Sequence, residues 1–219
     1  MKFIRMPLQS LAVVAGAGLM ATLTHAASFT PNAYVGADVA YGRASGLPSK
    51  VDGALASQGI TAHSHGDSSS TNPGLKLGYQ FDKNWAVELS YDRLGKMSVN
   101  SGITAPASDS ASGDWKAHGY GIHAVGSLPL DSKWSMTGRV GLENWHTRLN
   151  LASTTGGATR VSQSSTNNSL VLGVGAAYAV SKNLDATGEL VHYTRVGDSS
   201  TTGRDGVNTV NVGLRYHFM

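Results

Sequence analysis

The sequence predicts an all-β protein, an eight-stranded antiparallel up-and-down transmembrane β-barrel, and three observations lead to this fold class. Eight segments alternate apolar and polar residues with the period of two that is typical of strands. The connections between these segments alternate between short and long along the whole chain. Residues 1–26 have the pattern of an export signal, which directs the rest of the chain out of the cytoplasm.

The N-terminal segment is predicted to be a secretory signal peptide. Lys2 and Arg5 precede an apolar run over residues 11–23, and a small residue, Ala26, offers the cleavage site. A transmembrane helix is the alternative, but such a helix needs about 20 apolar residues and this run is shorter. We therefore assign residues 1–26 to the signal peptide and residues 27–219 to one barrel domain.

Composition narrows the function classes. Charged residues make up 14% of the chain, below the quarter or so that is usual for soluble domains. The chain has 17 Lys+Arg and 14 Asp+Glu; two of the basic residues lie in the signal peptide, which leaves 15 against 14. This near-neutral balance gives no support for nucleic-acid binding. Cysteine is absent, so neither a disulfide framework nor a thiolate metal site is predicted.

Most of the predicted strands are long enough for a tilted crossing of a bilayer, which needs about 9–11 residues. They cover residues 33–42, 74–81, 85–94, 115–128, 134–148, 168–180, 184–194 and 207–218. In the last strand, Val210, Val212, Leu214 and Tyr216 share one face while Arg215 lies on the other. We expect this last strand to close the barrel against the first.

The connections indicate which membrane the strands cross. Those at 82–84, 129–133 and 181–183 are short, whereas the intervening connections are longer and rich in Ser, Thr, Gly and Asn. A barrel of the outer membrane has short periplasmic turns and long external loops in this order. A soluble sandwich is the alternative, and it gives no reason for such sorting. The sequence therefore predicts the bacterial outer membrane, with four external loops.

The two faces of the strands differ in chemistry. One face is apolar, and its aromatic rings beside the short turns or the C-terminus predict a girdle at one membrane interface. The girdle residues are Phe81, Trp85, Trp134, Tyr178, Tyr216 and Phe218. The other face carries charges that pair across a narrow lumen, whereas a soluble sandwich would bury them at high cost. The predicted lumenal ionic network contains Asp38, Lys76, Glu88, Asp92, Arg139, Glu143, Glu189 and Arg215.

The stretch LGYQFDKNWAVELSYDRLGKM (77–97) resembles the transmembrane domain of the outer membrane protein A family. The resemblance continues through 137–141, 179–198 and 212–218, and it covers essentially the whole mature chain. It implies an eight-stranded barrel with lumenal salt bridges. Within that pattern, Glu88 resembles the central lumenal glutamate, Arg139 the arginine of the fifth strand, and Glu189 the glutamate of the seventh.

The chain departs from the family at other charged positions, which carry Val125, Ala177 and Thr187 here. We therefore expect Lys76, Arg139 and Arg215 to supply the positive partners. Many members of the family carry a peptidoglycan-binding domain after the barrel. Because this chain stops at Met219, we expect a stand-alone barrel.

Cations follow the lipid-facing rows on the external side of three neighbouring strands. Arg93, Lys116 and Arg148 lie just beyond the last apolar residues of their rows. Lipopolysaccharide phosphates lie at that height, and Arg pairs well with phosphate. We predict that these three residues contact lipopolysaccharide. Ordinary snorkelling of long side chains at an interface is the alternative.

We predict a structural function: an outer-membrane barrel that supports envelope integrity and presents external loops for surface interactions. A narrow ion or small-solute channel is one alternative, although side chains usually fill an eight-stranded barrel. A lipid A-modifying hydrolase is another, because His192 and Thr194 share a face as a base and a nucleophile would. Glu189, however, has the opposite strand parity from His192.

We predict no enzyme activity, no catalytic residue, no cofactor and no metal ion for this chain. The expected partners are outer-membrane lipid, lipopolysaccharide, the outer-membrane insertion machinery and an extracellular ligand of the loops. Nucleic acid is not an expected partner.

Overall fold

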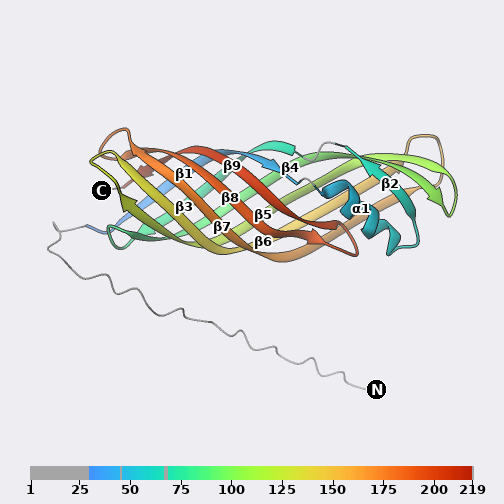
Figure 1. The fold of residues 1–219 in the computed structure, drawn as a ribbon, viewed down its shortest axis with the longest axis horizontal. Coiled ribbons are helices and arrows are strands. Elements are labelled where there is room, and N and C mark those ends of the chain that lie inside the picture. Colours follow the sequence, from blue (N-terminus) through green and yellow to red (C-terminus); the bar gives the residue numbers. More distant parts are fainter. Residues whose placement is uncertain (1–29, 45, 67–68, 219) are drawn as a thin grey trace, which may run out of the picture.

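The computed structural model describes residues 30–44, 46–66 and 69–218, and these form one long barrel whose strands are tilted relative to its axis (Figure 1). The predicted signal peptide, residues 1–26, lies outside the described residues. The elements are β1 Asn32–Arg43, α1 Leu47–Ala56, β2 Thr61–His65, β3 Ser69–Gln80, β4 Trp85–Ala105, β5 Asp109–Pro129, β6 Trp134–Ser153, β7 Arg160–Ala179, β8 Leu184–Asp198 and β9 Gly203–His217.

The barrel is a closed ring of eight antiparallel strands. β1 pairs with β3, each later strand of the ring pairs with the next, and β9 returns to pair with β1. The closing register runs from Tyr34 opposite His217 to Arg43 opposite Asn208. In the membrane-facing part of the ring, closure gives each strand a hydrogen-bonded neighbour on both sides. The predicted eight-stranded fold is confirmed, including closure of the last strand against the first.

The outer wall of the barrel is apolar over its membrane-facing part. Large side chains such as Leu77, Leu89, Val140 and Leu214 are about half exposed there. The six girdle residues lie at the end of the barrel that carries the short turns and the C-terminus. Five of them are 46–52% exposed, and the ring of the sixth, Tyr178, packs against Trp134 with ring centroids 4.9 Å apart.

The strands continue far beyond this apolar band, and the prediction of long external loops is wrong over most of their length. β4 extends to Ala105 and β5 begins at Asp109, so only residues 106–108 connect them. β6 and β7 are likewise joined by residues 154–159 alone. Ladder hydrogen bonds along these paired strands order segments that look loop-like by composition.

The polarity of the wall reverses in this external part. Residues that face inward are apolar, and those that face outward are polar, as in a water-soluble β-protein. On β6, for example, the inward Trp145, Leu149 and Leu151 are buried, while Asn144 and Arg148 face outward and are exposed. The barrel therefore has an apolar exterior where it meets lipid and an apolar interior where it meets water.

Two elements that the sequence analysis missed complete the external part. α1 has Pro48 in its first turn. It buries Leu47, Val51, Ala54 and Leu55, whose spacing places them on one face of the helix. It lies against β2 and β9, and β2 pairs with the external end of β4. Across the described part of the chain, no helix is long and apolar enough to cross a membrane.

Candidate functional site

The interior of the membrane-facing barrel holds a buried ionic network. Arg139 on β6 is at its centre: Nη2 lies 2.9 Å from Glu88 Oε1 and 3.0 Å from Glu189 Oε2, and Nε donates to Glu189 Oε1 at 3.1 Å. Lys76 on β3 extends the network, with Nζ 2.6 Å from Asp38 Oδ2 and 3.0 Å from Glu189 Oε2. Five strands thus contribute two cations and three carboxylates to one cluster.

Tyr34 fills the lumen on the periplasmic side of this cluster. Its hydroxyl donates a hydrogen bond to Glu88 Oε2 at 3.0 Å, and its side chain is 1% exposed. The ring lies directly over Gly78 on β3, where a Cβ atom would collide with it. Glycine at this position therefore makes the space that the aromatic ring occupies. The remaining cavity beside the network is about 20 Å³, room for about one water molecule.

The other three residues of the predicted lumenal network lie outside this cluster. Glu143 is fully buried beside Ser90, which donates to it at 3.1 Å, and beside His123, whose Nε2 lies 3.4 Å from Glu143 Oε2. Asp92 is buried without a salt bridge among the described residues. The predicted residue Arg215 pairs with Asp185 at 3.4 Å, nearer the periplasmic end.

The sequence analysis missed Asp185 and its second partner. Asp185 lies opposite Arg215 in the β8–β9 register, and His217 Nε2 is 3.0 Å from its carboxylate. Strand parity was the available signal, because Asp185 and Glu189 are separated by four residues and so share a face. Tyr34 was missed because the sequence analysis assigned large apolar and aromatic residues to the lipid-facing side of the strands. The Tyr34 ring instead faces the lumen.

A second, apolar layer closes the external half of the barrel. Trp115, Trp145 and Tyr193 belong to one buried cluster with the apolar face of α1. The turn between β8 and β9 folds into the same interior: Trp115 Nε1 donates to the carbonyl of Thr202 at 3.1 Å, and the Thr202 hydroxyl lies 3.1 Å from that of Thr147. The lumen is thus filled by ion pairs at one level and by apolar side chains at the next.

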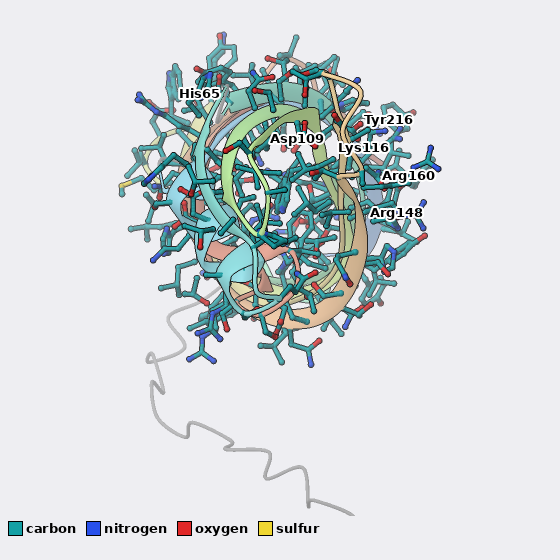
Figure 2. The ribbon with its side chains drawn as sticks, turned by 90° about the vertical axis from the view of Figure 1, so that its right-hand side faces the viewer. His65, Asp109, Lys116, Arg148, Arg160 and Tyr216 are labelled. Atoms are coloured by element: carbon teal, nitrogen blue, oxygen red, sulfur yellow. The ribbon has the colours of Figure 1, made fainter. Side chains whose placement is uncertain are left out.

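The outer wall of the barrel carries a cationic face on β4, β5 and β6. Lys96, Lys116 and Arg148 are consecutive cross-strand partners in one row. Like charges in directly opposite positions destabilise a sheet. Among the described residues, Asp114 is the one carboxylate that pairs with this row, with Oδ2 3.0 Å from Lys116 Nζ. Seen from the external end, Lys116, Arg148 and Arg160 project from the same side of the ring (Figure 2).

A second row lies one step closer to the membrane. Arg93, His118 and His146 are consecutive partners there, and the two histidine rings are 5.3 Å apart. The next row toward the membrane contains Tyr91 and Tyr120, whose rings are 5.0 Å apart. The three residues predicted to contact lipopolysaccharide therefore lie in the two rows immediately outside an aromatic row.

Comparison with known proteins agrees with this architecture. Residues 30–219 match the family model described as the OmpA-like transmembrane domain. The chain belongs to this family. The family and its relatives place this OmpA-like barrel in the bacterial outer membrane.

Two relatives are named outer membrane protein A. The Serratia marcescens protein is 29% identical over 148 residues, which is 66% of this chain and 38% of that protein. The Yersinia pseudotuberculosis protein is 30% identical over 146 residues, 66% of this chain and 39% of that protein. The matched stretch therefore spans less than half the length of these relatives. The crystal structure of Neisserial surface protein A shares the fold, with 17% identity, a TM-score of 0.52, and coverage of 85% of this chain and 97% of that one.

The three residues that the family resemblance singled out lie together in the OmpA-like barrel. Glu88 and Glu189 both contact Arg139. Val125 and Thr187, at positions where the family places charge, line the wall beside this cluster. Lys76 supplies the second cation.

The residues behind the hydrolase alternative do not lie together. His192 and Thr194 face outward from β8, whereas Glu189 faces the lumen and contacts Arg139 and Lys76. The His192 ring instead meets Asn208, with Nδ1 2.8 Å from Oδ1.

At the external tip of the OmpA-like barrel, Asp109 organises the turn between β6 and β7. Its carboxylate accepts hydrogen bonds from the Thr155 hydroxyl at 2.6 Å, the Thr159 backbone N–H at 3.3 Å and the Ser153 hydroxyl at 2.8 Å. These bonds stabilise the charged form, so they lower the pKa of Asp109 well below its usual range.

The turn between β6 and β7 is expected to loosen only at a pH low enough to protonate Asp109. Because the pKa of Asp109 is lower in the folded protein, the carboxylate contributes stability above its unfolded pKa, about 3.9, and loses it as pH falls through the lowered folded value. The protection factors of the Gly157 and Thr159 amides in hydrogen exchange should therefore stay high near neutral pH and fall below about pH 3.9. The Asp109→Asn variant should show no such pH-dependent step, and an identical step in this variant would contradict the assignment to Asp109.

Proposed function

We propose that this OmpA-like protein is a structural barrel whose lumen does not conduct ions. It holds the external part of the barrel, with α1 and β2, as a rigid unit at the cell surface. The observation that carries the proposal is the double closure of the lumen. The Arg139 cluster and Tyr34 fill the membrane level, and the apolar cluster around Trp145 fills the external level.

The chemistry of the two levels argues against an ion path. A side-chain-filled interior is usual for eight strands, and the space beside the Arg139 cluster holds about one water molecule. An ion that passed this level would then have to enter an apolar core, where an unpaired charge is strongly disfavoured. Rearranging salt bridges alone would not open the second level.

Planar-bilayer recording of the purified full chain tests this proposal. We expect no steady single-channel conductance from the native protein, and none from Glu88→Ala, because that variant leaves the apolar level intact. A steady conductance in the native protein that changes in Glu88→Ala or Arg139→Ala would establish a channel instead.

We also propose that the cationic face contacts lipopolysaccharide phosphates. The row of Lys96, Lys116 and Arg148 and the neighbouring Arg93 support this, because they lie just outside the aromatic row at Tyr91 and Tyr120, at the level of lipid head groups. The row of Lys96, Lys116 and Arg148 sets three like charges side by side, a cost that a bound polyanion would offset.

Lipopolysaccharide retention tests the second proposal. The triple variant Arg93→Ala/Lys116→Ala/Arg148→Ala should copurify with markedly less lipopolysaccharide than the native protein. Arg195→Ala/Arg204→Ala, which removes two exposed cations from β8 and β9, is the matched control and should retain the native amount. Equal retention by the native protein and the triple variant would count against the proposal.

A further inference from the structure

We propose a separate binding groove for a single-chain fatty acid on the outer wall across β7, β8, β9 and β1. This side of the ring is opposite the cationic face, because β9 lies four strands away from β5 in either direction around the ring. The wall is hollowed here by a groove of about 670 Å³, within the range of about 300–1,000 Å³ that is typical of small-molecule sites.

Two rows of residues that lie directly opposite one another on neighbouring strands line this groove. The row nearer the external side runs through Leu172, His192, Asn208 and Arg43, each directly opposite the next. The row nearer the membrane centre runs, in the same strand order, through Val174, Leu190, Val210 and Tyr41. The groove thus has a polar end and an aliphatic end at the edge of the apolar band.

The polar end presents hydrogen-bond donors around one positive charge. Within the described residues, Arg43 has no carboxylate within salt-bridge distance, and its side chain is exposed. The His192 Nδ1–H donates to Asn208 Oδ1 at 2.8 Å, because an amide oxygen only accepts. This bond holds the Asn208 side chain and leaves its NH₂ group as a donor beside Arg43. A carboxylate matches a guanidinium with a neighbouring amide donor.

The aliphatic end suits one hydrocarbon chain. Val174, Leu190 and Val210 are 63%, 59% and 47% exposed and form an unbroken apolar strip below the polar row. Arg139 also lines the groove, but Glu88 and Glu189 already pair with it, which leaves Arg43 as the cation for a ligand. One row of the cationic face carries three cations, and this difference favours a ligand with one negative charge over a multiply phosphorylated lipid. Because lipid tails are about as apolar as leucine, the head group decides the affinity.

Electron paramagnetic resonance of a spin-labelled stearate tests the proposal, with the full chain in nanodiscs of zwitterionic phospholipid. We expect an immobilised spectral component that unlabelled palmitate displaces. Arg43→Gln should weaken binding by about tenfold or more, as expected for loss of a charge-assisted hydrogen bond. Val210→Trp, which fills the aliphatic end, should also reduce the immobilised component.

The matched control is Arg148→Gln, which removes an exposed arginine from the opposite wall and should leave binding unchanged. Native binding by Arg43→Gln, or an equal loss in Arg148→Gln, would overturn the proposal, since either result indicates ordinary annular lipid. Displacement by stearyl alcohol as effective as that by palmitate would overturn the carboxylate assignment, as would stronger displacement by a single-chain phosphate lipid. Heat-modifiable gel migration confirms folding of each variant, and Arg43→Gln alone decides the outcome if Val210→Trp does not fold.

Discussion

Replacing Arg139 with alanine is expected to lower the free energy of unfolding of the barrel by about 3–5 kcal/mol. Arg139 contacts Glu88 and Glu189 at 2.9 and 3.0 Å, and all three side chains are buried. Lys76 still reaches Glu189 in the variant, but among the described residues Glu88 would keep the Tyr34 hydroxyl as its one side-chain hydrogen-bond partner. An intact buried ion pair contributes little stability beyond what apolar packing would give. The expected loss therefore comes from the buried negative charge that is left without a partner.

Urea unfolding in lipid vesicles, followed by tryptophan fluorescence, measures this effect. The control is Arg139→Met combined with Glu88→Gln and Glu189→Gln, which removes the charges together and should recover much of the lost stability. A loss just as large in this triple variant would show that the shape of the Arg139 side chain, rather than charge balance, holds the network together.

The membrane-facing half of the barrel was predictable from the sequence because lipid imposes a simple rule on it. Every outward residue must be apolar, so strict alternation alone assigns Glu88, Arg139 and Glu189 to the lumen. Which charges touch was less predictable. Asp92 and Glu143 share the lumenal face, yet they lie outside the Arg139 cluster, since strand parity gives the face of a residue but not the register between strands.

The external half was not predictable by the same rule, because its solvent is water. There the inward rows are apolar and the outward rows are rich in Ser, Thr and Asn, which read as loop composition in a single sequence. Met97, Val99 and Ile103 do alternate along β4 and are buried, so the strand signal was present. Its polarity was the reverse of that of the membrane half, and Gly95, at a bulge with positive φ, interrupts the pattern between the two.

Because of this reversal, the barrel has two separate cores inside one continuous wall: the ionic cluster around Arg139 and the external apolar core, which depends on α1. Replacing Leu55 with aspartate is expected to displace α1 from the external core while the membrane half stays folded. Leu55 is fully buried in the apolar cluster with Trp115 and Trp145. An unpaired buried charge belongs to the small class of substitutions that cost about 4 kcal/mol or more, which is enough to favour a helix that leaves the core.

Limited trypsin digestion measures the outcome, because Lys50 is exposed on α1 and its peptide bond becomes cleavable when the helix leaves the core and unwinds. Cleavage at Lys50 should accelerate strongly in Leu55→Asp, while heat-modifiable migration on gels should remain near that of the native protein, since the Arg139 cluster is untouched. Ala56→Asp places the same charge on the adjacent, exposed position of α1 and should behave like the native chain. Loss of heat-modifiable migration together with rapid cleavage would mean that the two cores fold as one unit, because the wall strands would then transmit the damage across the polarity boundary.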